Sequence, residues 1–176
     1  MNPSKPDSHP RRPTLPPRVA NDFPALFRHG TQLLHRGKAA EALPFLEQAV
    51  ALQPTHLDAN INLSGAYILQ KQFRRAVAVL EPLQETAENN AMFWVNLGAA
   101  YLGNPILARD EEQLRAITAF EKAYAINPAT PHVAYNLGLI HRDRQETAVA
   151  IHWFQRALQA NPFDRDAQSI LNRLQS

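Results

Sequence analysis

The sequence contains no cysteine, has six glycines among 176 residues, and is poor in charge, since Asp, Glu, Lys and Arg make up 19% of it. The lack of cysteine excludes disulfide bonds and cysteine-ligated metal sites. No apolar run approaches the roughly 20 residues that a membrane-spanning helix needs, and the first residues lack the apolar segment of a secretory signal. We therefore expect a cytoplasmic protein with no membrane partner.

The small excess of positive charge lies at the N-terminus. Eighteen Lys and Arg residues against 16 Asp and Glu residues give a formal net charge of +2. The first 20 residues contain four basic residues and one acidic residue, a sum of 4 − 1 = +3, so the remainder carries 2 − 3 = −1. Because nucleic-acid recognition requires a basic stripe on the folded part, we expect no nucleic-acid partner.

Residues 1–21 combine this basic charge with six prolines and almost no large apolar side chains. Such a segment cannot bury enough apolar surface to offset the entropy lost on ordering. We interpret it as a disordered, proline-rich basic tail with partial polyproline-II character. A flexible leader and a proline-rich recognition motif around Pro13, Pro16 and Pro17 are both open interpretations.

From about residue 22 the pattern becomes helical, and it repeats. The clearest copy has four residues at three-, four- and seven-residue offsets, which lie on one helical face. They are Trp94, Leu97, Gly98 and Tyr101. A second helical face follows and ends at a proline. Its residues are Ala116, Phe120, Ala123 and Pro128.

Three more copies of this two-helix pattern occur. Their first helices contain Leu26, Gly30 and Leu33, then Asn60, Leu63, Ser64 and Tyr67, and finally Ala134, Leu137, Gly138 and His141. Leu26, Asn60 and Trp94 are spaced by 34 residues, and Ala134 follows Trp94 after 40, one period plus six. A single helix pair cannot bury its apolar faces alone, so the pairs must stack.

This pattern resembles the tetratricopeptide repeat (TPR) family, whose signature is W-x2-L-G-x2-Y, A-x3-F-x2-A and P at a 34-residue period. The resemblance covers residues 22–163. It implies an all-α fold, a right-handed α-α superhelix of antiparallel helix pairs. Four repeats are expected at about 23–56, 57–90, 91–130 and 131–164, followed by a C-terminal capping helix over 164–176. The implied function is a protein–protein interaction scaffold rather than an enzyme.

Local signals predict where these helices begin and where the repeats become irregular. Thr55, Thr130 and Asp164 precede expected helices, and we predict that they cap them. Pro44 lies near the start of its helix, where proline is tolerated. Pro82 lies late in the second helix of repeat two, so we expect that helix to kink or end early. The junction between repeats two and three is therefore predicted to be irregular.

The third repeat carries its six extra residues within Leu102–Gln113. Gly103, Asn104 and Pro105 predict a turn, and residues 109–113 are predicted to be helical. Two interpretations are open, a tolerated surface insertion and a projecting contact loop.

Asparagine recurs at one place in three first helices, as Asn62, Asn96 and Asn136, and Arg28 takes that place in the first repeat. The resemblance implies that the first helices line a concave face, and some TPR proteins use such a row to hold a peptide. A side-chain amide offers one acceptor and two donors, which can pair with a peptide main chain. The alternative is that each amide only ties adjacent helices together.

Apolar residues within one turn of this row complete the candidate peptide-binding site. They are Phe27, Ile61, Val95, Tyr135 and Leu139. An apolar groove with a central amide row suits an extended segment with hydrophobic side chains. The alternative is that these residues fill contacts between repeats.

Catalysis and cofactor binding find no support. The seven histidines lack a metal-ligand spacing such as H-E-x-x-H, and we expect His141 to be a packing residue. The predicted partner is a protein or peptide of unknown identity. Alternatives are a self-associating structural repeat protein, a protein autoinhibited by its own tail, or an accessory subunit of an enzyme supplied in trans.

Overall fold

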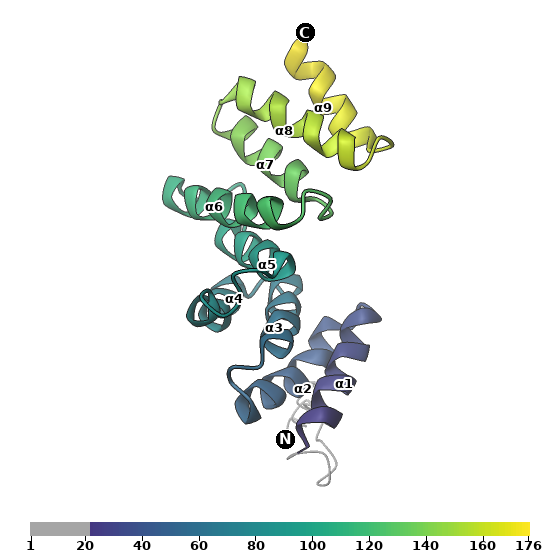
Figure 1. Ribbon diagram of the computed structural model, residues 1–176, viewed down its shortest axis with the longest axis vertical. Coiled ribbons are helices and arrows are strands. Elements are labelled where there is room, and N and C mark those ends of the chain that lie inside the picture. Colours follow the sequence, from purple (N-terminus) through teal and green to yellow (C-terminus); the bar gives the residue numbers. More distant parts are fainter. Residues whose placement is uncertain (1–21) are drawn as a thin grey trace, which may run out of the picture.

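The computed structural model describes residues 22–176, and this part of the chain is a stack of nine α-helices without strands. They are α1 (Phe23–His35), α2 (Ala39–Leu52), α3 (Leu57–Leu69), α4 (Phe73–Leu80), α5 (Ala91–Leu102), α6 (Asp110–Ile126), α7 (Val133–Asp143), α8 (Thr147–Ala160) and α9 (Arg165–Gln175). Figure 1 shows α1 at one end of an elongated molecule and α9 at the other. The tail expected over residues 1–21 lies outside the described residues.

The helices pack as successive pairs, α1 with α2, α3 with α4, α5 with α6 and α7 with α8. Each second helix also packs against the first helix of the next pair, and α9 covers α8 (Figure 1). The predicted all-α solenoid is therefore confirmed. Its core is a chain of apolar clusters rather than one centre, because each pair buries its apolar surface against its neighbours.

Close approach within a pair depends on small residues facing large ones. A Cβ atom placed on Gly30 would lie 2.7 Å from Cγ of Leu46, and one on Gly98 or Gly138 would lie 3.0 Å from the rings of Phe120 or Phe154. All three large side chains are fully buried. The small residues of the repeat pattern thus set the distance between paired helices.

Two of the three predicted helix caps are wrong. The Asp164 carboxylate does cap α9, accepting bonds from the backbone N–H groups of Asp166 and Ala167 at 3.1 and 3.0 Å. At α3, however, Nδ1 of His56 accepts from the N–H of Ala59 at 3.2 Å, so the cap lies one residue after Thr55. Thr130 instead donates its hydroxyl to the carbonyl of Asn127, within the turn before α7.

The junction between repeats two and three is irregular, as Pro82 predicts. Helix α4 ends at Leu80, after only eight residues, and a 3-10 turn, η1 (Glu81–Leu83), follows. Proline removes a backbone donor and clashes with the preceding turn, which ends the α-helical bonding there. Pro44 is accommodated inside α2, which continues to Leu52.

Polar side chains tie the first three repeats together on the side of the second helices. The hydroxyl of Tyr67 donates to Glu47 at 2.9 Å, and Arg75 pairs with the same carboxylate while its guanidinium lies 4.4 Å from the centre of the Tyr67 ring. We call this arrangement a Tyr–Glu–Arg clasp. Burial and the hydrogen bond to Glu47 raise the pKa of Tyr67 to about 12.

The same clasp recurs one period later with Tyr101, Glu81 and Arg115. It is not repeated at the fourth repeat, where His141 and Val149 occupy the places of the tyrosine and the arginine. His141 is buried, as a packing residue should be, and its Nδ1 lies 2.5 Å from Glu146. The junction between repeats three and four is therefore held differently from the two before it.

Candidate functional site

The first helices of repeats one to three lie side by side, α1 against α3 and α3 against α5. We call the surface formed by α1, α3, α5 and α7 the first-helix face. Helix α7 belongs to it less closely, because α7 packs on α8 and α6 and makes no comparable contact with α5. The fourth repeat is joined to this row through α6.

Two of the three predicted asparagines bond to the preceding repeat. Nδ2 of Asn62 donates to Oγ1 of Thr31 at 2.9 Å. Nδ2 of Asn96 donates to the carbonyl of Ile61 at 3.0 Å and to Oγ of Ser64 at 3.1 Å. Asn136 makes no side-chain bond within residues 22–176. Two amides therefore do tie adjacent helices together, which was the structural alternative for this row.

Both amides keep hydrogen-bonding groups that these bonds do not use. Both side chains are partly exposed, and neither Oδ1 accepts a bond from another described residue. Asn62 also keeps one N–H free, whereas Asn96 uses both. An amide carbonyl that is held in a fixed orientation and left open is a preorganised acceptor for a main-chain N–H group. Structural bonding and ligand binding are thus compatible at Asn62 and Asn96.

The predicted neighbours differ in exposure. Phe27, Val95, Tyr135 and Leu139 are partly exposed, and Arg28 is exposed. Ile61 is 8% exposed and belongs to the core, so its side chain can offer a ligand little surface. Its carbonyl accepts the hydrogen bond from Nδ2 of Asn96.

The aromatic members of this set are fixed by neighbouring rings. Phe27 stacks on Phe23 with ring centres 5.7 Å apart, and both contact the His56 ring. Tyr135 meets Phe154 edge-on at 5.8 Å, and burial raises its pKa. Half-buried, preoriented rings provide apolar contact area at little further cost in side-chain entropy.

The first-helix face also contains an exposed side chain that the sequence reasoning missed. Met92 is 50% exposed and lies one helical turn before Asn96 on α5, so the two share a helix face. The i, i+4 spacing was the available signal. Leu69, at the end of α3, is 62% exposed.

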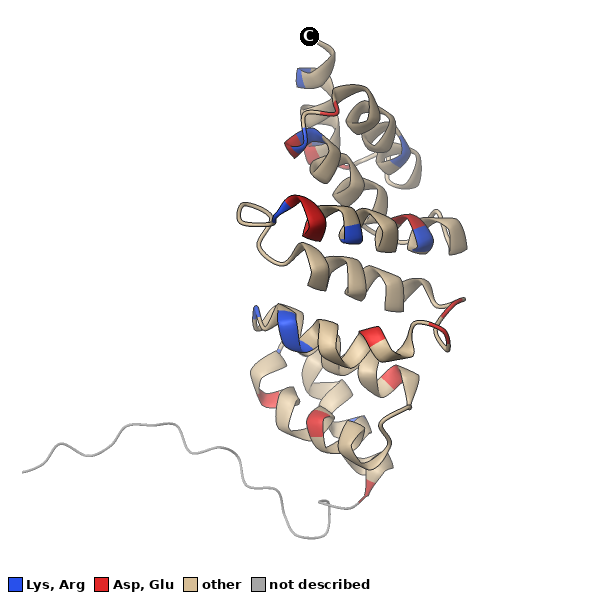
Figure 2. Ribbon diagram, turned by 90° about the vertical axis from the view of Figure 1, so that its left-hand side faces the viewer, with Lys and Arg blue, Asp and Glu red and all other residues tan. Residues whose placement is uncertain are grey.

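Charge is scarce on this face. Helix α5 contains no charged residue, and Asp58 is the one in α3. Figure 2 shows α5 entirely in tan beneath α6, which begins with three acidic residues. A charged group brought to the central part of this face would lose hydration without gaining an ionic partner.

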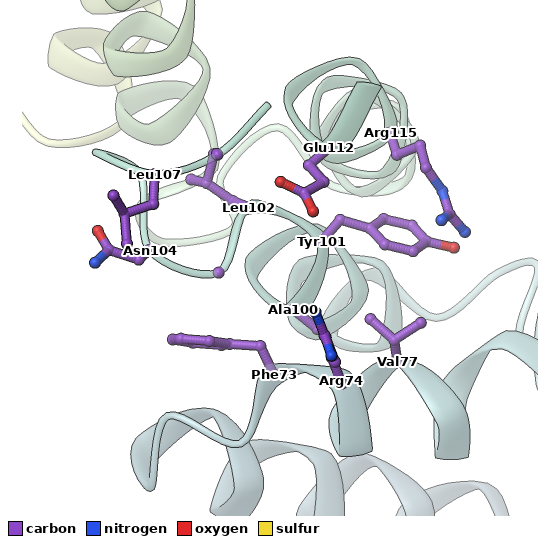
Figure 3. Close-up of a pocket in the computed structure, with 12 residues that line it drawn as sticks. Phe73, Arg74, Val77, Ala100, Tyr101, Leu102, Asn104, Leu107, Glu112 and Arg115 are labelled. Carbon is purple, nitrogen blue, oxygen red and sulfur yellow. The ribbon is translucent and has the colours of Figure 1, made fainter. Parts of the chain in front are cut away.

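A second feature lies at the insertion, on another side of the molecule. Residues 103–109 connect α5 to α6 and border a hollow of about 380 Å³ lined by Phe73, Val77, Leu102 and Leu107, among others. Figure 3 shows Phe73 of α4 reaching under this loop, with Glu112 and Arg115 of α6 above. Ile106 and Leu107 are 91% and 74% exposed, an unusual position for adjacent large apolar side chains.

Within residues 22–176, no helix is long and apolar enough to cross a membrane. The same part of the chain holds no group of three or more His, Cys, Asp or Glu side chains placed to bind a metal ion.

Stacked helix pairs of this kind define a class, the α-solenoids. Sequence patterns described as tetratricopeptide repeat match residues 33–100 and 114–165. The chain belongs to the tetratricopeptide repeat family.

Among known proteins, human tetratricopeptide repeat protein 7B is 23% identical over 88% of this chain. Mouse anaphase-promoting complex subunit 7 is 28% identical over 62% of it. The alignments span about a fifth of each of these longer proteins, 20% and 18%. The likeness therefore concerns a repeat region and not a whole relative.

Solved structures show the same fold at low sequence identity. A chain of the Cut9–Hcn1 hetero-tetramer of the anaphase-promoting complex has a TM-score of 0.75 and 18% identity, with 88% of this chain and 30% of that one covered. MamA from Desulfovibrio magneticus RS-1 has a TM-score of 0.70 and 24% identity, with 82% and 78% covered. TPR proteins in general mediate protein–protein interaction, and that coarse function applies to this chain.

Proposed function

We propose that this protein is a binding module that holds an extended segment of a partner protein along the first-helix face. Ligand main-chain N–H groups donate to the Oδ1 atoms of Asn62 and Asn96, and apolar ligand side chains contact Phe27, Val95 and Met92. The observation that carries the proposal is that bonds to the preceding repeat orient both amides and leave both carbonyl oxygens open.

The fourth repeat extends the same face with looser geometry. Asn136, Tyr135 and Leu139 offer an amide and two half-buried apolar side chains, but the amide has no bond to orient it among the described residues. An unrestrained side chain loses more entropy when a ligand orders it. We therefore assign Asn136 a smaller share of the binding energy than Asn62 or Asn96.

The ligand's chemistry follows from the scarcity of charge on α3 and α5. An uncharged segment with hydrophobic side chains loses little on entering such a groove, whereas each charged side chain would lose hydration without compensation. The basic N-terminal tail of this chain is for that reason a poor occupant. Arg28, exposed at the α1 end, is placed to pair with a single carboxylate of a longer ligand.

The proposal can be tested by selecting 12-residue peptides from a random display library against the full chain. Selected peptides should be uncharged and apolar. Removing two ligand hydrogen bonds of about 1 kcal/mol each corresponds to a roughly tenfold or greater loss of affinity. The Asn62→Ala/Asn96→Ala double variant should show this loss in isothermal titration calorimetry, with helicity retained.

Because Asn62→Ala also breaks the bond between repeats one and two, a matched control is needed. Thr31→Val removes the same bond from the other side and keeps the amide. It should weaken peptide binding less than Asn62→Ala does. Equal affinity of the double asparagine variant and the natural chain would refute the proposed function, and equal losses in Thr31→Val and Asn62→Ala would show that only the inter-repeat bond matters.

Ile106 and Leu107 indicate a second contact surface, at the insertion between α5 and α6. Two adjacent, exposed apolar side chains beside an apolar hollow are what a protein-binding surface offers. Arg74 at its rim forms no ion pair with another described residue, whereas Arg75, Arg109 and Arg115 do. We assign this surface to partner segments that place an apolar side chain next to a carboxylate.

A further inference from the structure

Gly65 has a place in α3 that helix packing does not explain. A Cβ atom added there would lie 3.7 Å from Nδ2 of Asn96 and 4.0 Å from Cδ2 of Leu34, which are ordinary contacts. At Gly30, the same atom would lie 2.7 Å from a buried leucine. Packing therefore requires glycine at position 30 and would accept alanine at position 65.

Backbone conformation does not require glycine there either. The glycines with positive φ are Gly37 and Gly103, and Gly65 lies inside the regular helix Leu57–Leu69. Within a helix, glycine destabilises the fold relative to alanine, because it loses more backbone entropy on folding. Gly65 thus lowers stability without a compensating contact inside the protein.

The surroundings of Gly65 indicate what its missing side chain leaves open. The residue is partly exposed on the first-helix face, and the nearest atom to its absent Cβ is Nδ2 of Asn96. One period earlier, Thr31 takes the equivalent place, and its side chain lies against the amide of Asn62 at 2.9 Å. A side chain at position 65 would lie against the amide of Asn96 in the same way.

We infer that Gly65 is a specificity-determining residue, which lets the main chain of the bound segment approach α3 closely beside the Asn96 amide. This inference rests on the proposed function. The space is about that of one missing methyl group, too little for a large ligand side chain, and a ligand backbone supplies the N–H that the Asn96 carbonyl accepts. Close approach of a ligand to the protein backbone is a common reason for glycine.

The test uses the full chain and the 12-residue peptide selected against it. Gly65→Ala should raise the melting temperature and weaken peptide binding about tenfold, and Gly65→Leu should weaken it further. Ala51→Leu, which introduces the same side chain as Gly65→Leu at an exposed position of α2, serves as the control and should leave binding unchanged. A variant that is more stable yet binds less tightly is the result that a merely structural glycine would not produce.

Two results would overturn the inference while leaving the proposed function intact. A lower melting temperature for Gly65→Ala would show that packing needs the glycine. Unchanged affinity in both Gly65 variants, with affinity still lost in Asn96→Ala, would show that the ligand does not approach α3 at this point. Failure of the asparagine variants to reduce binding would instead refute the proposed function, and this inference with it.

Discussion

Replacing Gly30 with alanine should destabilise the protein, although alanine is the better helix former. The added Cβ atom would lie 2.7 and 2.8 Å from Cγ and Cδ2 of Leu46, and 3.3 Å from its backbone nitrogen. Leu46 is fully buried, so it cannot turn away into solvent. Overpacking a core in this way costs about 1–3 kcal/mol, and the gain in helix propensity is roughly 0.5–1 kcal/mol. The difference is a net loss of roughly 0–2.5 kcal/mol, with a central value of about 1 kcal/mol.

Urea unfolding followed by far-UV circular dichroism measures this loss directly. The midpoint should fall and the slope should stay the same, since the surface exposed on unfolding does not change. Gly65→Ala is the matched control, because Gly65 also lies inside a 13-residue first helix and has room for a Cβ. It should gain roughly 0.5–1 kcal/mol. The reasoning is refuted if Gly30→Ala is as stable as the natural chain, or if the two variants shift in the same direction.

Two further predictions concern the clasp and the insertion. Because the pKa of Tyr67 is about 12 in the folded chain and its ordinary value is 10, the neutral phenol is favoured by folding. Its contribution is complete below pH 10 and is lost as the pH rises towards 12, in total about 2–3 kcal/mol. Urea unfolding at pH 9 and at pH 11 measures this. Between these two pH values the free energy of unfolding should fall less for Tyr67→Phe than for the natural chain. Equal falls for the two proteins would contradict the prediction. At the insertion, peptides selected against the Asn62→Ala/Asn96→Ala variant should stop binding after Ile106→Ser/Leu107→Ser, with stability changed by less than about 0.5 kcal/mol. Retained binding would exclude this surface.

Much of the architecture follows from features that act within a few residues along the chain. The spacing of small and large residues at three, four and seven positions identifies the helix pairs, because the pitch of an α-helix fixes which side chains share a face. The early end of α4 at Leu80, two residues before Pro82, and the cap at Asp164 are similarly local. The missed caps show the limit. At α3 the neighbouring side chain of His56 takes the free N–H group in place of Thr55, and α7 begins after His132 with no side-chain cap, because the Thr130 hydroxyl bonds to the carbonyl of Asn127 instead.

The sequence by itself determined that asparagine recurs at one place in three of the four repeats, and that glycine or serine lies where paired helices meet. Only the tertiary structure decided that Asn62 and Asn96 bond to the preceding repeat while Asn136 does not, and that Gly30 is needed for packing while Gly65 is not. The reason is physical. A residue's place on its own helix depends on local pitch. Its partners belong to other helices, either the paired helix, as with Gly30 and Leu46, or the preceding repeat, as with Asn62 and Thr31, and the separation of those helices depends on the side chains packed between them.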